Sequence, residues 1–145
     1  MNQTHPLLVQ IQQGESKTLE FKAELPKGEQ LAKTLIAFAN CAGGKLIIGV
    51  DDSRKLIGIS SDIFELQDKI ADIIATSCYP SLLPEIYIEN IQNIELLVIE
   101  VSRGALMPYY LKKHGKEQGT YIRLGATNRQ ASFEYIQELE RQDSN

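Results

Sequence analysis

Three carboxylates near two predicted strands are of the residue type that a divalent cation requires. Glu15 and Glu20 stand at the entry to one predicted strand, and Asp51 follows another. If the strands are neighbours, these side chains can meet at one end of a sheet as oxygen ligands for Mg²⁺ or Mn²⁺. Such a metal would activate water against a phosphodiester, with Lys22 stabilising the developing charge. The alternative is that Asp51-Asp52 is an ordinary turn and that the glutamates are solvated.

A second candidate site lies in residues 101–130, where basic residues are concentrated although the chain has a net charge of −4. Arginine presents a planar fork of donors that fits phosphate oxygens. Threonine and asparagine can position a nucleic-acid backbone without reading its sequence. The candidate nucleic-acid ligands are therefore Arg103, Lys112, Lys113, Lys116, Arg123, Thr127, Asn128 and Arg129.

Each candidate in this basic segment also has a purely structural interpretation. Arg123 can form an internal ion pair with a glutamate, and the lysines can belong to a solvated loop. Tyr109 and Tyr110 can stack on unpaired bases, or they can pack in the core. His114 has no paired nucleophile in the sequence and is expected to be solvated.

Gly43-Gly44-Lys45 has some of the residues of a phosphate-binding loop, but not its order of elements. That loop connects a strand to a helix, with Ser or Thr after the lysine, so that the helix N-terminus faces the phosphate. Here the glycines follow a predicted helix and precede a predicted strand, and Leu46 follows the lysine. We therefore expect Gly43 to end the helix in a left-handed conformation, and ATP binding is disfavoured.

The hydrophobic pattern predicts the elements that must position these residues. Helices are expected at 6–13, 29–41 and from Asp62 to Tyr79-Pro80, with a last helix after Ser132 that turns Phe133, Ile136 and Leu139 inward. Strands are expected at 18–22, 45–50, 55–59, 85–89, 94–101 and 120–124. Hairpins mixed with helices predict an α+β fold, with a mixed, largely antiparallel sheet, two main helices and a C-terminal helix.

The composition indicates a single globular domain over residues 1–145. The chain is 43% hydrophobic and 23% charged, as is usual for a folded domain. It has neither an apolar run of about 18–20 residues for a bilayer nor an N-terminal signal pattern, so we expect a cytoplasmic protein. Cys41 and Cys78 are expected to be buried, reduced thiols rather than a disulfide or a zinc site.

Three blocks of sequence resemble, in order and spacing, the AlbA-like domain of the Schlafen family. Residues 15–22 (ESKTLEFK) are similar to its E-S-x-x-x-E-F-K opening. Residues 37–52 (AFANCAGGKLIIGVDD) are similar to its A-F-A-N-x-x-G-G-x-L-x-I-G-V-x-D core, and residues 121–127 (YIRLGAT) to its Y-x-R-x-G-x-x-T segment. The agreement extends over residues 14–140, and such domains occur in bacterial transcriptional regulators as well as in Schlafen proteins.

The resemblance implies a Schlafen AlbA-like fold and a nucleic-acid-binding role. In Schlafen proteins the matching acidic residues are associated with metal-dependent RNA cleavage, which makes Glu15, Glu20 and Asp51 candidate metal ligands and, with Lys22, a candidate active site. The chain departs from eukaryotic members because it lacks their Cys/His zinc element and their duplicated arrangement. A single copy would bind without cutting, or would form a groove as a homodimer.

Three hypotheses about function follow from these patterns. The first is a domain that binds DNA or RNA through the basic segment, as a regulatory module of transcription. The second is an endoribonuclease that uses Mg²⁺ or Mn²⁺ held by the carboxylates. The third is a protein-interaction or assembly module, which the negative net charge leaves open.

Overall fold

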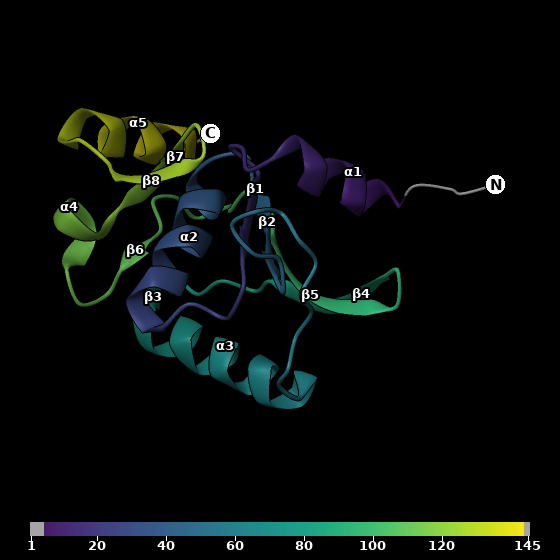
Figure 1. Ribbon diagram of the computed structural model, residues 1–145. Coiled ribbons are helices and arrows are strands. Elements are labelled where there is room, and N and C mark those ends of the chain that lie inside the picture. Colours follow the sequence, from purple (N-terminus) through teal and green to yellow (C-terminus); the bar gives the residue numbers. More distant parts are fainter. Residues whose placement is uncertain (1–4, 144–145) are drawn as a thin grey trace.

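A four-stranded sheet forms the centre of the molecule in the computed structural model, which describes residues 5–143 (Figure 1). Its strands are β1 (Leu19–Lys22), β2 (Gly44–Ile48), β5 (Ile94–Val101) and β4 (Glu85–Ile91), in that spatial order. β1 and β2 are parallel, whereas β2–β5 and β5–β4 are antiparallel. The prediction of an α+β fold with a mixed, largely antiparallel sheet is confirmed.

Within residues 5–143, five helices accompany the sheet. They are α1 (Pro6–Gln13), α2 (Gly28–Asn40), α3 (Ile63–Ser77), α4 (Gly115–Gly119) and α5 (Phe133–Asp143). The side chain of Asp62 accepts a hydrogen bond from the Phe64 amide at 2.7 Å and so caps α3, as the sequence predicts. No helix within residues 5–143 is long and apolar enough to cross a membrane.

The sheet separates two hydrophobic cores, because successive side chains of a strand point to opposite faces. On one face, Leu46 and Ile48 of β2 pack with α2 and α3. On the other face, Ile47 packs with Leu19 and Phe21 of β1 and with α1. The alternation in β1 therefore turns Glu20 towards α2, which decides the environment of this candidate residue.

Two further antiparallel strand pairs in the described part of the chain lie beside α2. β3 (Cys78–Tyr79) pairs with β6 (Tyr110–Leu111), and β7 (Tyr121–Leu124) pairs with β8 (Thr127–Gln130). β7 was expected, but β3, β6 and β8 were not. A two-residue strand is too short to show a period, and the polar sequence of β8 resembles that of a loop.

Two local predictions are wrong. Residues 55–59 do not form a strand: the pairing is limited to a bridge between Val50 and Leu56, and Gly58 departs from extended geometry at φ +81°. Phe133 points outward and is 60% exposed, because the buried stripe of α5 begins one turn later, at Ile136 and Leu139.

Candidate functional site

Glu20 and Arg123 form a buried ion pair between β1 and β7. The Nη1 of Arg123 lies 2.7 Å from Oε1 of Glu20, and the two residues are only 4% and 7% exposed. Thr34 of α2 donates a hydrogen bond to the second carboxylate oxygen at 3.2 Å. Because isolated charges are costly to bury, each member of this pair requires the other.

The guanidinium of Arg123 has further partners inside the protein. It donates to Oδ1 of Asn128 at 2.8 Å, to the Ser16 carbonyl at 3.0 Å and to the Leu19 carbonyl at 3.3 Å. The Nδ2 of Asn128 in turn donates to Oγ1 of Thr34 at 3.0 Å. The alternative interpretation of Arg123, an internal ion pair with a glutamate, therefore holds. The polar groups of Arg123 and Asn128 are directed to partners inside the protein and not outward to a phosphate.

The three predicted metal ligands do not converge. Oε2 of Glu15 accepts the Phe21 amide at 3.0 Å, and Oδ1 of Asp51 accepts the amides of Ser53 and Lys55, both at 2.9 Å. β1 and β2 are neighbours as required, but they are parallel, so Glu15 precedes one end of the pair and Asp51 follows the other end. Within the described residues, no group of three or more His, Cys, Asp or Glu side chains could hold a metal ion. The prediction that these three carboxylates meet at one end of the sheet is therefore wrong.

Lys22 does share a face with Glu20, as their spacing along the strand predicts. Both residues line a hollow of about 520 Å³, together with Thr34 and Asn128. Glu15 lines a different hollow, of about 580 Å³, beside Lys45. The acid that has Lys22 beside it is Glu20, and this carboxylate is already paired with Arg123.

The other predicted nucleic-acid ligands are exposed, and several make local contacts. Lys112 donates from Nζ to the Ala75 carbonyl, near the end of α3, at 2.7 Å. Lys116 pairs with Glu140 at 3.0 Å, and Arg103 donates to Gln142 at 2.5 Å. Glu140 and Gln142 are two positions apart on α5, so Lys116 and Arg103 lie on opposite sides of this helix.

The remaining candidates lie at the surface. Thr127 donates to the Leu124 carbonyl at 2.8 Å and accepts from Nε of Arg129 at 3.3 Å. Lys113 is exposed next to His114, whose Nε2 lies 2.7 Å from Oε1 of Glu29. The hydrogen bond from His114 lowers the pKa of Glu29 below 4.5, with smaller contributions from the charges of His114, Lys33 and Lys113. The 112–116 segment therefore lies beside α2.

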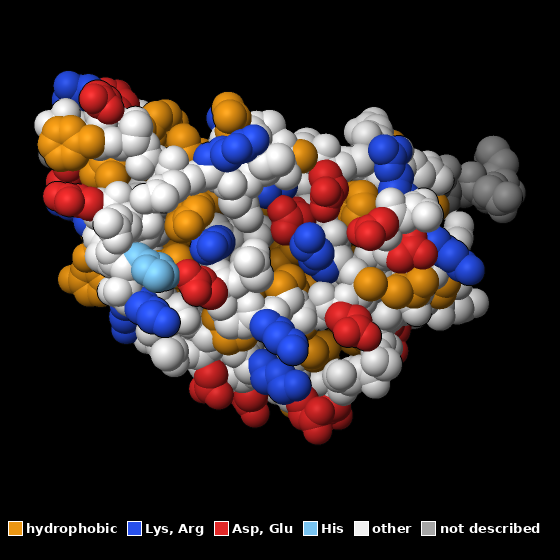
Figure 2. All heavy atoms as spheres, turned by 60° about the vertical axis from the view of Figure 1, so that its left-hand side comes forward, with side chains coloured by type: hydrophobic (Ala, Val, Ile, Leu, Met, Phe, Trp, Pro, Cys, Tyr) orange, Lys and Arg blue, Asp and Glu red, His pale blue; other side chains and the backbone are white. Residues whose placement is uncertain are grey.

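Acidic and basic side chains alternate on the face that carries α4 and α5 (Figure 2). The cations therefore stand in small groups, and no broad basic surface covers this face. Binding of a polyanion here would depend on small groups of cations and would be weakened by salt.

The two candidate stacking tyrosines differ in accessibility. Tyr109 is buried, and its amide donates to Oδ1 of Asn40 at 2.7 Å. Tyr110 is half-buried and lies against Tyr79, with the ring centroids 5.5 Å apart and the planes at 49°. Tyr79 is 53% exposed. This pair could not be predicted from the sequence, because the β3–β6 pairing that brings the two rings together was not expected.

Asn40 and Gly43 of the second sequence block have structural roles. Asn40 is buried and donates to the carbonyls of Tyr109 and Tyr121, each at 2.8 Å. Gly43 ends α2 at φ +79°, with its amide on the Phe38 carbonyl at 2.8 Å. This confirms the expected left-handed conformation after the helix. Gly43 lies between α2 and β2, and Gly44 begins β2. This order, helix before strand, is not the geometry of a phosphate-binding loop.

The thiols of both cysteines are free and buried, as predicted. Burial raises the pKa of Cys78 to about 12. Cys41 accepts a weak hydrogen bond from the Arg123 amide at 3.4 Å. Neither thiol has the exposed, thiolate-stabilising environment of a reactive cysteine.

Similarity to known proteins agrees with this architecture. The N-terminal domain of a Nitrosomonas europaea protein, named for its relation to the ATP-dependent DNA helicase RecG, superposes with a TM-score of 0.66 at 28% identity; the match covers 92% of the chain and 95% of that domain. The DIP2311 protein of Corynebacterium diphtheriae matches in fold, with a TM-score of 0.60 at 20% identity, over 89% of the chain and 24% of that protein.

Sequence comparison identifies one curated relative and a family. An uncharacterized ATP-binding protein of Ureaplasma parvum serovar 3 is 38% identical over 73 residues, which are 47% of this chain and 21% of the relative's length. The family model described as "Schlafen, AlbA_2" matches residues 15–132, which include all three sequence blocks. The chain therefore belongs to the Schlafen AlbA_2 family.

Proposed function

We propose that this domain binds nucleic acid through phosphate contacts made by exposed cations of the basic segment, and that it acts in the cytoplasm as a regulatory module of transcription. The cations are Arg103, Lys112, Lys113, Lys116 and Arg129, with Thr127 beside them. Family membership and the similarity to a RecG-related domain support this class of partner. Arg123 and Asn128 are left out of the contact surface, because they stabilise the fold.

The observation that carries the proposal is the position of the 112–116 segment. Oγ1 of Thr120 donates to the Lys116 carbonyl at 2.6 Å, and α4 gives the segment a defined conformation. Lys112 and Lys113 are exposed, and Lys113 is close enough to Glu29 of α2 to affect its pKa. A short group of cations in a fixed conformation suits backbone contacts that do not read sequence.

The Tyr79–Tyr110 pair favours a single strand over a duplex. Tyr110 stands two residues before Lys112, so the half-buried Tyr110 ring and the exposed Tyr79 ring lie near the lysines. Unpaired bases can stack on such rings while phosphates meet the cations, whereas the bases of a duplex are already stacked. We therefore expect a preference for single-stranded DNA or RNA.

Fluorescence anisotropy with short labelled oligonucleotides tests the proposal directly. We expect binding at low salt that weakens steeply between about 50 and 200 mM salt, because phosphate contacts release counterions. The double variant Lys112→Ala/Lys113→Ala should bind more weakly and reduce the salt slope by about 1 to 2. Lys55→Ala, which removes an exposed lysine from the 51–55 turn, is the matched control. Absence of binding to any DNA or RNA at low salt would contradict the proposal and favour an assembly module.

ATP binding is not part of this proposal. The name of the Ureaplasma parvum relative includes ATP binding, but the match covers 21% of that protein. In this chain Gly43 lies between α2 and β2, and Gly44 is the first residue of β2, so a strand and not a helix follows the glycines. We expect no change in melting temperature on addition of ATP and Mg²⁺; a dose-dependent rise would require a nucleotide site elsewhere in the domain.

A further inference from the structure

We propose that a groove beside α3 is a binding site for a small organic anion with an apolar body. The groove lies between α3, residues 23–28 and residues 57–61, and we call it the α3 groove. Its volume of about 780 Å³ falls in the range of small-molecule sites, roughly 300–1,000 Å³. It contains none of the cations assigned to nucleic acid above.

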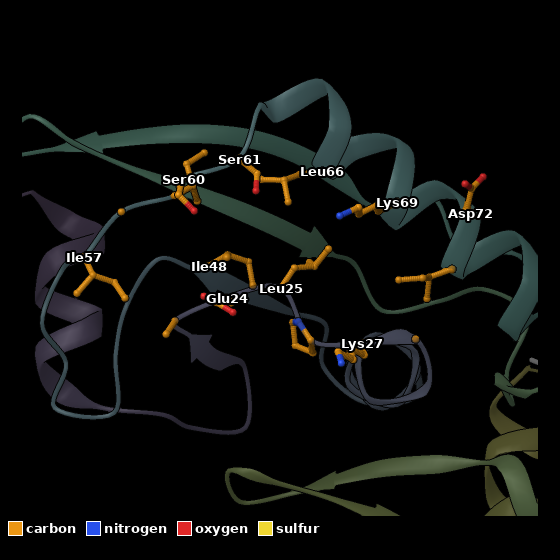
Figure 3. Close-up of a pocket in the computed structure, with 16 residues that line it drawn as sticks. Glu24, Leu25, Lys27, Ile48, Ile57, Ser60, Ser61, Leu66, Lys69 and Asp72 are labelled. Atoms are coloured by element: carbon orange, nitrogen blue, oxygen red, sulfur yellow. The ribbon is translucent and has the colours of Figure 1, made fainter.

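The floor of the α3 groove is aliphatic. Leu25 of the loop before α2, Ile48 of β2 and Leu66 of α3 point into the same space (Figure 3). Ile59 and Ile73 extend this lining and are half-buried against the core. An apolar body placed here would leave water and gain about 25 cal/mol for each Å² that it buries.

Two lysines stand on facing walls of the groove. Lys69 projects from α3 and Lys27 precedes α2, with Leu25 between them (Figure 3). Among the side chains that the structure describes, neither ammonium group has a hydrogen-bond or ion-pair partner. Two unpaired cations above an aliphatic floor can take a carboxylate or phosphate head group, while the rest of the ligand lies on the floor.

The acidic residues of the groove restrict the class of ligand. Glu24 and Asp72 also belong to the lining, so its formal charges balance, and the carboxylate of Asp72 points away from the lysine pair (Figure 3). A bare inorganic anion gains little from such a balanced field. An uncharged apolar molecule would leave both ammonium groups without a partner. The groove therefore favours molecules that combine one anionic head with an apolar body.

Octyl phosphate and octanoate are suitable probes, because each combines an anionic head group with an apolar chain. Inorganic phosphate tests the head group alone, and 1-octanol tests the apolar chain without the charge. Chemical-shift perturbation of the backbone amides by NMR locates binding and measures its affinity. We expect both amphipathic probes to shift amides of residues 23–28, 57–61 and 66–73 with millimolar or better affinity. Inorganic phosphate and 1-octanol should each bind at least tenfold more weakly; the two head groups show whether phosphate or carboxylate is preferred.

Variants separate the two halves of the proposed site. Lys69→Ala and Lys27→Ala should each weaken octyl phosphate binding about fivefold, as expected for one exposed ion pair of about 1 kcal/mol. Ile73→Ala should weaken octyl phosphate but leave the weak binding of inorganic phosphate unchanged, and Lys55→Ala should change neither. Saturable octyl phosphate binding that Lys69→Ala and Lys27→Ala leave unchanged, or no binding by the wild-type protein, would overturn the proposal. Nucleic-acid binding is measured separately and with different variants, so either proposal can fail alone.

Discussion

Glu20 and Arg123 are 103 positions apart in the sequence, yet their charged groups meet at 2.7 Å in a buried ion pair. One belongs to the first sequence block and the other to the third, while Thr34 and Phe38 of α2 contact the pair. The blocks that indicate the family thus meet in a network that holds β1, α2 and the β7–β8 pair together. The structure thus gives Glu20, Arg123 and Phe38, one from each block, a role in holding the fold together.

Breaking this pair should destabilise the protein strongly. Arg123→Ala or Glu20→Ala leaves one buried charge without a partner, and we expect each to lower the free energy of unfolding by about 3–5 kcal/mol. Urea unfolding followed by circular dichroism measures this change, with Lys55→Ala as control. A loss below about 1 kcal/mol in both variants would place the pair among weak surface ion pairs. A loss of activity in Glu20→Ala therefore does not identify a catalytic residue unless stability is also measured.

Asn40→Ala should also destabilise the domain. It removes three hydrogen bonds and leaves two carbonyls and one amide unsatisfied in a buried region, for which we expect a loss of about 2–4 kcal/mol. Thermal unfolding of Asn40→Ala beside Gln137→Ala, an exposed change on α5, provides the comparison. Equal melting temperatures would mean that water replaces all three contacts.

The protein should lack a specific Mn²⁺ or Mg²⁺ site at the predicted carboxylates. Glu15, Glu20 and Asp51 are engaged in separate contacts, so the melting temperature should change by less than about 1 °C with either metal at a concentration well above typical dissociation constants. Paramagnetic broadening by Mn²⁺ offers a more local measurement. Broadening that is centred on residues 15, 20 and 51 together would show that they converge in solution.

The Glu29–His114 contact should appear in a pH titration. His114 lowers the folded-state pKa of Glu29 below its ordinary value of 4.5. Because the carboxyl pKa is lower in the folded state, the ionised carboxylate stabilises that state at any pH above the pKa of the unfolded chain. This contribution is lost as the pH falls through the folded-state pKa. NMR titration of the Glu29 carboxyl should give a midpoint below 4.5 that rises in His114→Ala. An unchanged midpoint would exclude the hydrogen bond as the cause.

Tyr79→Ala should weaken single-stranded binding selectively. Stacking on a ring contributes about 1–3 kcal/mol for each base, so we expect at least a fivefold loss for a single strand and little change for a duplex. Anisotropy with matched single-stranded and double-stranded oligonucleotides measures both. Phe133→Ala removes an equally exposed ring from α5 and is the control; equal effects of the two variants would contradict a defined stacking surface.

The long periodic elements were predictable, but the contacts between them were not. The hydrophobic spacing predicts β1 from Leu19 and Phe21, and it predicts α3 from Ile63 to Ile74, because local geometry fixes which side chains share a face. The direction of β1 relative to β2 is a long-range property, and it decides that Glu15 and Asp51 lie at opposite ends of the pair. Arg123 could be given two interpretations from sequence, and only the packing of β7 on α2 distinguishes between them.

Burial of Cys78 has a practical consequence for experiments with this domain. Because burial raises the pKa of Cys78 to about 12, its thiol stays protonated at neutral pH, whereas maleimide or iodoacetamide reagents attack the ionised form. Cys41 is also buried, so the native domain should resist alkylation. A cysteine introduced at an exposed position such as Lys55 would then carry a fluorophore at one defined place without removal of the native thiols.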